Sequence, residues 1–225
     1  MLSSNNTIDI FKRSLSVTVK SIGKSKDAEI KFVTEYPSIN GKQINLTLPR
    51  ISTLKKDLNY LRGEADSMAL ELRLHDSKIH QQFVTGNNTI NKILNVIEQS
   101  RCEAKGSQIF KGIRVNINNK HNRDLSNMNT ENKNENQLIL AFRYVSYAEF
   151  TNQNFSGKFP FYKKFLKNKL GDQYSRYIKS LKDSLDNQKE FASKIQSMLD
   201  DLGFFNSLDR DDHNQNDLEQ NKETI

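Results

Sequence analysis

The chain has 225 residues, a formal net charge of +7, and a hydrophobic share of 35%. Its length is sufficient for one domain with a sizeable core, whereas the low apolar share predicts additional segments that do not pack. No run of about 18 apolar residues occurs, and the first residues lack a secretory signal pattern, so we expect a cytoplasmic protein. Cys102 is the single cysteine, which excludes an internal disulfide and a zinc site built from several thiolates.

The charge is unevenly distributed along the chain. Residues 206–225 contain six acidic and two basic residues, a net charge of −4, so residues 1–205 carry +11. A basic body with an acidic tail is compatible with a nucleic-acid partner, an acidic partner or self-masking. The alternative is a lysine- and asparagine-rich composition without a specific ligand. We predict one domain over residues 1–205 and an acidic, disordered linker or tail over residues 206–225.

The N-terminal quarter predicts a helix followed by two strands. Residues 8–22 favour the helix. In the segments AEIKFV and INLTLP, residues 28–33 and 44–49, apolar and polar residues alternate, which is the period of a half-buried strand. Pro37 and Gly41 lie in the connection, so we predict a small β-hairpin with a loose turn.

A long central helix is predicted next, beginning after Ser52 or Thr53. Apolar residues recur at steps of three and four over residues 54–83, as in an amphipathic helix. The sequence TGNNT then interrupts the pattern, and Asn88 or Thr89 can cap a second helix. Because the connection is short, the two helices are expected to form an antiparallel hairpin.

The rest of the chain predicts a loop and two further helices. Residues 116–137 include nine asparagines, and such a segment buries too little apolar surface to offset its ordering entropy, so we predict a flexible loop. The segment LILAFRYVSYAEF predicts a buried helix. A last long helix is expected from Tyr174 to Leu202, with Gly203 as its stop signal. The expected fold class is therefore mainly α, a helical domain with a small N-terminal β element.

The segment LRGEADSMALELRLHDSKIH concentrates ionisable residues on one predicted helix. Arg62, Asp66, Arg73, Asp76 and His80 follow the apolar positions with a shift of one residue, so they form a polar stripe beside the apolar one. Pairs three or four residues apart in an exposed stripe contribute about 0.2–0.5 kcal/mol each. We interpret the stripe as a salt-bridged helix surface.

The alternative is a metal or proton-transfer site that uses Asp76 and His80, with Glu98 or Glu103 from the second helix. The segment HDSKIH lacks the i,i+4 histidine spacing of a zinc-protease helix. His75 and His80 are five residues apart, about 140° of rotation on one helix, so His75 is not expected in such a site. We interpret His75, on the apolar side, as a hydrogen-bonded core histidine.

Gly63 lies inside the predicted central helix, where glycine costs roughly 0.5–1 kcal/mol relative to alanine. Close approach by another segment or by a partner subunit explains such a glycine, and chance tolerance is the alternative. We expect the ionic side of this helix to contact protein. The candidate partner-interface residues are Arg62, Gly63, Asp66 and Arg73.

Two segments, LRGEADSMALELRLHDSKIHQQF and IEQSRCEAKGSQIFKGIRVN, resemble the N-terminal region of the CobT-type subunit of aerobic cobaltochelatase. INLTLPRIS and KEFASKIQSMLDDLGFF fit the same region, so the resemblance covers nearly the whole chain and is weakest over residues 116–137. The matching residues are Arg62, Gly63, Ala65, Asp66, Ala69, Leu70, His75, Asp76, His80, Glu98, Gln99, Arg101, Glu103, Ala104 and Gly106.

The resemblance implies a role in a complex that uses ATP to insert cobalt into hydrogenobyrinic acid a,c-diamide during cobalamin biosynthesis. In that family a large subunit holds the corrinoid and the metal, and an AAA+ subunit hydrolyses ATP with magnesium. The CobT-type subunit assembles with the AAA+ ring and couples it to the large subunit. The resemblance therefore implies a non-catalytic subunit that binds no cofactor of its own and can form homo-oligomers.

The sequence departs from the family in one respect. Family members continue past an acidic linker into a von Willebrand-type domain with a metal-ion-dependent adhesion motif, whereas no Asp-x-Ser-x-Ser occurs here. We expect a truncated form, one half of a split gene or a remnant. Coupling to the large subunit is then in doubt, and binding to the AAA+ partner is the function expected to survive.

The sequence also bears on other functions. The chain contains no phosphate-binding Gly-x-x-x-x-Gly-Lys-Ser/Thr loop, and no Ser-His-Asp or Cys-His arrangement can be read from it. Residues 161–184 hold seven basic, two acidic and five aromatic residues, a composition that suits single-stranded nucleic acid. The remaining alternatives are a hydrolase or metalloenzyme built on the four candidate ligands, and a chaperone-like adaptor of an AAA+ ATPase retained without cobalamin synthesis.

Overall fold

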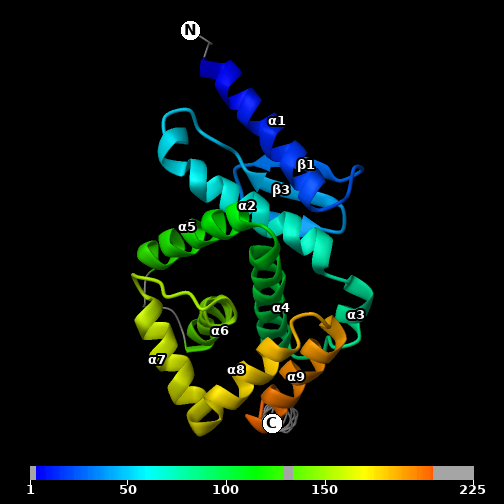
Figure 1. Ribbon diagram of the computed structural model, residues 1–225, viewed down its shortest axis with the longest axis vertical. Coiled ribbons are helices and arrows are strands. Elements are labelled where there is room, and N and C mark those ends of the chain that lie inside the picture. The colour runs from blue at the N-terminus through cyan, green and yellow to red at the C-terminus, as the bar shows by residue number, and fades with distance from the viewer. Residues whose placement is uncertain (1–3, 129–133, 205–225) are drawn as a thin grey trace, which may run out of the picture.

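The computed structural model describes residues 4–128 and 134–204 (Figure 1). Helices account for most of these residues, which confirms the mainly α fold class. The elements in chain order are α1 (Ser4–Ile22), β1 (Glu29–Val33), β2 (Ser38–Asn40), β3 (Gln43–Thr47), α2 (Leu54–Leu74), α3 (Ser77–Gln81), α4 (Asn88–Ile109), α5 (Lys111–Asn127), α6 (Asn134–Thr151), α7 (Phe159–Leu170), the 3₁₀ turn η1 (Gly171–Gln173), α8 (Tyr174–Asp183) and α9 (Gln188–Asp201).

The N-terminal sheet has three strands in the order β1-β3-β2. β1 and β3 are the two runs that the sequence predicts, but they pair in parallel, with Ile30 opposite Ile44. The predicted hairpin between them is therefore wrong. The connection itself forms β2, which pairs antiparallel with β3 across a turn at Gly41, where φ is +56°. A parallel pair requires a crossover, and the segment that was expected to be a loose turn supplies it.

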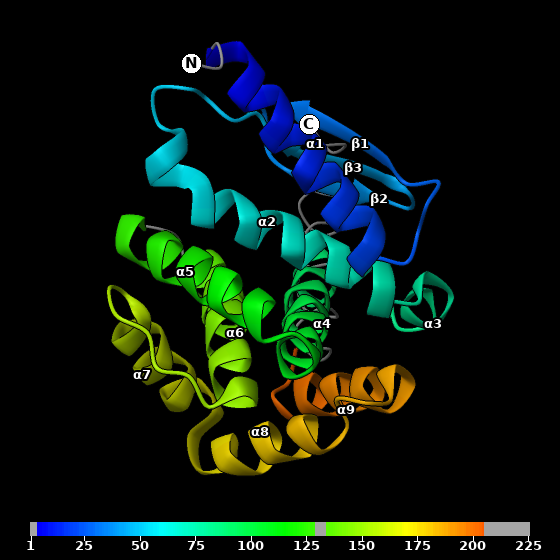
Figure 2. The ribbon, with the colours of Figure 1, turned by 45° about the horizontal axis from the view of Figure 1, so that its top comes forward.

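The predicted N-terminal helix is confirmed as α1, which lies across the sheet in Figure 2. α1 and α2 enclose an apolar core together with the inward side chains of β3, Ile44 and Leu46, which are fully buried. From α1 this core includes Phe11, Leu15 and Val19. These residues recur every fourth position, so one stripe of the helix faces the core.

The long helix predicted over residues 54–83 is divided in two. α2 ends at Leu74, His75 is extended with φ −95° and ψ 125°, and a short helix α3 follows. The Asp76 carboxylate accepts hydrogen bonds from the backbone N–H groups of Lys78 (2.8 Å) and Ile79 (3.2 Å). Aspartate is a favoured N-cap because it satisfies these unpaired donors. Asp76 therefore starts a new helix instead of continuing the polar stripe.

The flexible loop predicted over residues 116–137 is wrong for most of its length. Residues 116–127 belong to α5, residues 134–137 belong to α6, and residues 129–133 lie outside the described part of the chain. Four residues at steps of four are buried along α5: Ile113, Ile117, His121 and Leu125. Packing against α2 and α4 stabilises this helix, because burial of one face outweighs the weak helix propensity of asparagine.

The cap of α4 is Asn87, one residue before the first predicted cap, because its side chain accepts from Thr89 N (2.8 Å) and Ile90 N (3.1 Å). Contacts between α2 and α4 run in opposite chain directions, as in an antiparallel pair, since Ser67 meets Glu103 and His75 meets Glu98. Figures 1 and 2 nevertheless show α4 crossing α2 steeply instead of lying along it. The predicted side-by-side hairpin is therefore a crossing, and α4 packs mainly along α6.

The second and larger core lies between α4, α6 and the C-terminal helices. The predicted buried helix LILAFRYVSYAEF is confirmed within α6. The predicted last long helix is divided into α8 and α9 by residues 184–187, and Asn187 caps α9 by accepting from Glu190 N (3.1 Å). Gly203 ends α9 with φ +75°, as expected for a helix stop.

No helix in the described ranges combines the length and the apolar character needed to cross a membrane. The predicted acidic tail, residues 206–225, lies outside the described residues.

Candidate functional site

A buried ionic cluster joins α4, α5 and α6. Glu103 on α4 has fully buried carboxylate oxygens; one accepts from Arg143 Nη2 on α6, and the other lies 2.9 Å from His121 Nε2 on α5. The Ser67 hydroxyl of α2 also donates to Glu103. Burial alone would raise the pKa of Glu103, but Arg143 and His121 hold this pKa below its usual range. The carboxylate is therefore charged and joins four helices.

His121 is neutral in this cluster at ordinary pH. Burial lowers its pKa to about 4, although the adjacent Glu103 carboxylate acts in the opposite direction. Its Nδ1 atom has no hydrogen-bond partner among the described residues. With Nε2 protonated and donating to Glu103, Nδ1 is a lone-pair acceptor. An unpaired acceptor of this kind costs less than an unpaired buried charge.

A second ionic junction lies where α2 ends. The Arg101 guanidinium, 2% exposed, donates from Nε and Nη2 to the two oxygens of Glu98 at 2.8 and 2.7 Å. The same guanidinium donates to the carbonyl oxygens of Leu74 (2.8 Å) and Leu185 (3.1 Å). Arg101 thereby ties the end of α2 to α4 and to the turn before α9. The planar fork of arginine suits this arrangement because it directs several donors at fixed angles.

The predicted close approach at Gly63 is confirmed, and the approaching segment is α5 of the same chain. A Cβ at Gly63 would clash with the backbone carbonyl of Asn116 and lie 2.8 Å from the Lys120 Cβ. Gly106 on α4 has the same role towards α2, since a Cβ at Gly106 would lie 2.7 Å from the Leu70 Cγ. Both glycines let two helices approach closely.

Two other candidate interface residues also bond within the chain. The Asp66 carboxylate, buried on α2, accepts from the side-chain amide of Asn116 (2.8 Å), and burial raises its pKa. Arg73 donates to the carbonyl oxygen of Ile22 (3.0 Å) and lies over the Phe110 ring. Arg62, by contrast, is exposed on α2.

The four candidate metal ligands do not meet. Asp76 caps α3, Glu98 is bonded to Arg101, and Glu103 belongs to the separate cluster with His121. His80 lies near Glu98 but bonds to the amide of Asn95 instead. Across residues 4–128 and 134–204, no three histidine, cysteine or acidic residues are grouped as a metal site would require.

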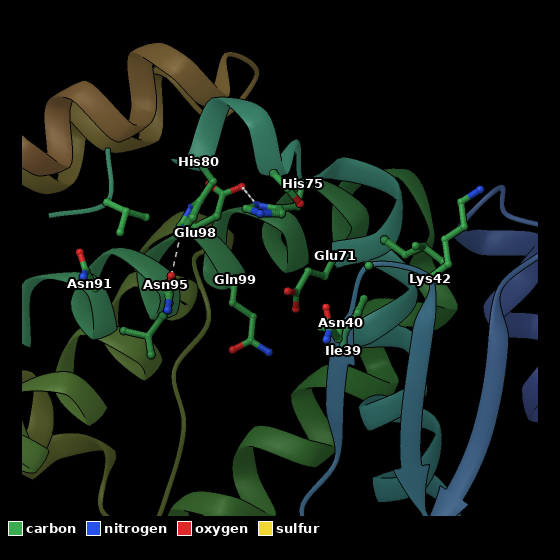
Figure 3. A pocket seen from close by; sticks show the side chains of 15 residues that line it. Ile39, Asn40, Lys42, Glu71, His75, His80, Asn91, Asn95, Glu98 and Gln99 are labelled. Carbon is green, nitrogen blue, oxygen red and sulfur yellow. Dashed lines mark hydrogen bonds and ion pairs between the residues drawn. The ribbon is translucent and has the colours of Figure 1, made fainter. Parts of the chain in front are cut away.

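A cleft of about 640 Å³ opens between α2, α4 and the edge of the sheet (Figure 3). His75 and His80 both line it, and their rings meet edge to face with centroids 4.8 Å apart. His75 Nδ1 lies 3.1 Å from Glu98 Oε1, and His80 Nε2 lies 2.8 Å from Asn95 Oδ1. The predicted hydrogen bonding of His75 is confirmed, but its predicted core position is wrong, because the half-buried ring lines the cleft. The expected separation of the two histidines is wrong, because the rotation argument assumed one continuous helix.

Burial and neighbouring charges shift the titratable side chains that line the cleft towards their neutral or negative forms. Burial and the neighbouring His75 lower the pKa of His80, against the effect of its bond to Asn95. Burial would raise the pKa of Glu98, but Arg101 and His75 lower it overall. Glu71 also lines the cleft, and burial raises its pKa. Sequence reasoning did not single out Glu71; its position one turn before the end of α2, near His75, was the available signal.

The basic and aromatic segment over residues 161–184 is less open than its composition suggests. Tyr162, Tyr174 and Tyr177 are buried and belong to the larger core, and Phe165 is half-buried. Phe161, at 41%, is the one exposed large aromatic of this segment. Base stacking needs accessible aromatic rings. Because most rings of this segment are buried, its composition gives little support for a nucleic-acid-binding surface.

The fold and the site together define a mainly helical domain whose buried ionic groups join its own helices. The chain belongs to the family described as cobalamin biosynthesis protein CobT, which matches residues 5–224. No solved structure matches the chain. Membership gives the protein a cobaltochelatase-related role in cobalamin biosynthesis, in a complex with other subunits.

Proposed function

We propose that this chain is a non-catalytic assembly subunit of an ATP-dependent aerobic cobaltochelatase. In this proposal the complex inserts cobalt into hydrogenobyrinic acid a,c-diamide, and the chain binds the AAA+ ATPase subunit in the cytoplasm. ATP, magnesium and cobalt are handled by other subunits, and coupling to the large corrinoid-binding subunit is left out of the proposal. The chain itself contributes a rigid helical platform.

The observation that carries the proposal is that most ionisable residues behind the family resemblance bond to groups of the same chain. Among the ionisable ones, Asp66, Asp76, Glu98, Arg101 and Glu103 all bond to groups of the same chain. A catalytic set would leave a nucleophile, base or ligand directed at a shared space. Here these five residues fix how the helices and α3 are joined, as expected for a structural subunit, while the matching residues His75 and His80 line the cleft.

The experiment is a binding assay between this chain and the purified AAA+ subunit, with ATP and magnesium, by analytical ultracentrifugation. We expect a stable complex, and no association would contradict the proposal. Arg62, the exposed interface candidate, provides a site-directed variant. Arg62→Glu is expected to weaken binding, whereas Arg13→Glu, at an arginine that is also exposed but lies on α1, is expected to leave it unchanged.

A second measurement separates assembly from catalysis. The rate of ATP hydrolysis by the AAA+ subunit is measured with and without this chain, and the chain is also assayed alone. We expect no hydrolysis by the chain alone and a changed rate in the mixture, because assembly alters the ATPase ring. Hydrolysis by the isolated chain would contradict a non-catalytic role.

A further inference from the structure

The Glu71 carboxylate differs from the other buried or half-buried carboxylates of α2 and α4. Glu64 accepts from the backbone and hydroxyl of Thr47 at 2.7 and 2.8 Å, and Asp66 is bonded to an amide. Glu98 and Glu103 each face an arginine. Within residues 4–128 and 134–204, no hydrogen bond or ion pair joins the Glu71 side chain to another group, and His75 and Arg143, which act against the effect of burial on its pKa, are not bonded to it. Removing a carboxylate from water without a partner is costly.

Glu71 faces the cleft, where the surrounding groups are mostly acceptors or amides. Figure 3 shows Glu71, Asn40 and Gln99 around the same space, with Asn91 and Asn95 on the α4 side. The one lysine that lines the cleft is Lys42, and its ammonium already pairs with Asp27. The cleft therefore offers a half-buried carboxylate and several amide oxygens, and no described lysine or arginine is bonded to Glu71.

The other wall of the cleft is the edge of the sheet. β2 is an outer strand, bonded on one side to β3, and Ile39 and Asn40 of this strand line the cleft. No backbone group elsewhere in the described ranges bonds to Ser38, Ile39 or Asn40 along the free side. An unpaired strand edge is a template for an added strand.

We propose that this cleft receives an extended segment of a partner polypeptide that carries an arginine or lysine side chain. The segment pairs with the free edge of β2, and its cationic side chain enters the cleft to meet the Glu71 carboxylate. Leu72, Val84 and Val96 line the cleft and contact the methylene stem of the inserted side chain, while its charged end bonds to Glu71 and the amide oxygens. This inference rests on the proposed function and takes the segment to belong to the AAA+ subunit.

Charge complementarity selects a basic segment over an acidic one. The body of this chain is basic overall, so a partner with matching acidic surface would be attracted to many places on it. The cleft is an exception, because the group in it that lacks a hydrogen-bond or ion-pair partner among the described residues is the Glu71 carboxylate. A side chain with several donors gains a charge-assisted pair there, whereas an acidic side chain would meet a like charge in a partly desolvated space.

The test compares the affinity of the AAA+ subunit for the unsubstituted chain, for Glu71→Gln and for Glu35→Gln. Glu35 is exposed outside the cleft, so its variant makes the same change of charge without touching the site. We expect Glu71→Gln to raise the Kd by about tenfold or more and Glu35→Gln to leave it within about twofold. The Tm of each variant confirms folding, and Glu71→Gln is expected to keep or raise it.

Hydrogen exchange on the unsubstituted chain gives a second readout that does not depend on a variant. Binding of the AAA+ subunit is expected to slow exchange of the backbone amides of residues 38–40. An unchanged Kd for Glu71→Gln, or unchanged exchange at β2 in a formed complex, would overturn this inference alone. Failure of the unsubstituted chain to bind the AAA+ subunit would overturn the proposed function and the inference with it.

Discussion

Arg143 on α6 donates to Glu103 on α4 in the interior of the protein, and the carboxylate is fully buried. The two residues are 40 positions apart, so their pairing fixes how α6 lies along α4. His121 approaches the same carboxylate from α5. This contact makes the orientation of three helices depend on one ionic group.

Removing one partner of this pair is expected to be strongly destabilising. Glu103→Gln leaves the Arg143 guanidinium buried without its counter-ion, and such changes typically cost about 3–5 kcal/mol. Urea unfolding followed by circular dichroism measures the change in the free energy of unfolding. Lys194→Gln, which breaks the more exposed Lys194–Glu190 pair on α9, serves as the control and is expected to cost less than about 1 kcal/mol. Equal effects of the two substitutions would contradict the role given to Glu103.

Gly63 and Gly112 provide a matched test of helix approach. Gly63→Ala places a methyl group against the Asn116 carbonyl, so despite the better helix propensity of alanine we expect a loss of about 1–3 kcal/mol of stability. At Gly112 on α5 nothing lies within 4 Å of an added Cβ. Gly112→Ala is therefore expected to be neutral or to stabilise by up to about 1 kcal/mol. Thermal denaturation of both variants checks the difference in sign.

The pH dependence of stability should carry a contribution from His121. Its pKa is about 4 in the folded protein and about 6.5 when unfolded. Between these values the unfolded state binds the extra proton, so the free energy of unfolding falls as pH is lowered from about 6.5 towards 4. The slope for one proton approaches about 1.4 kcal/mol per pH unit.

His121→Gln removes this contribution and keeps a side-chain donor for Glu103. The stability advantage of the unsubstituted protein over His121→Gln is expected to shrink as pH falls from about 6.5 to 4. Titrations of other groups, including the raised pKa values of Glu64 and Asp66, are shared by both proteins and cancel in the comparison. Parallel stability curves over this range would exclude a neutral, buried His121.

Cys102 is expected to be unreactive in the folded protein. The thiol is fully buried, and burial raises its pKa well above the usual value, so little thiolate forms. At pH 8 a disulfide reagent should label native Cys102 on the order of a hundredfold or more slowly than the urea-unfolded chain. Since the chain has a single cysteine, the signal has one source. Fast labelling under native conditions would show that the α2–α4 junction opens readily.

The local sequence determined where many elements lie. Apolar residues at steps of three and four placed α2, and period-two alternation placed β1 and β3; most of α1 and the buried part of α6 were also expected from the sequence. The glycine inside α2 indicated a close neighbour before that neighbour was known. These features depend on the backbone and on side chains within one or two turns, so they can be read without the rest of the fold.

Tertiary structure decided how those elements pair and which groups the polar side chains contact. The parallel register of β1 and β3 and the helical state of the asparagine-rich α5 both depend on burial against distant segments. His75 and His80 meet because the chain bends at Asp76, which a continuous periodic pattern does not reveal. Local propensities are small compared with the free energy of burying a helix face or pairing a buried charge, so contacts between distant segments made the final choice.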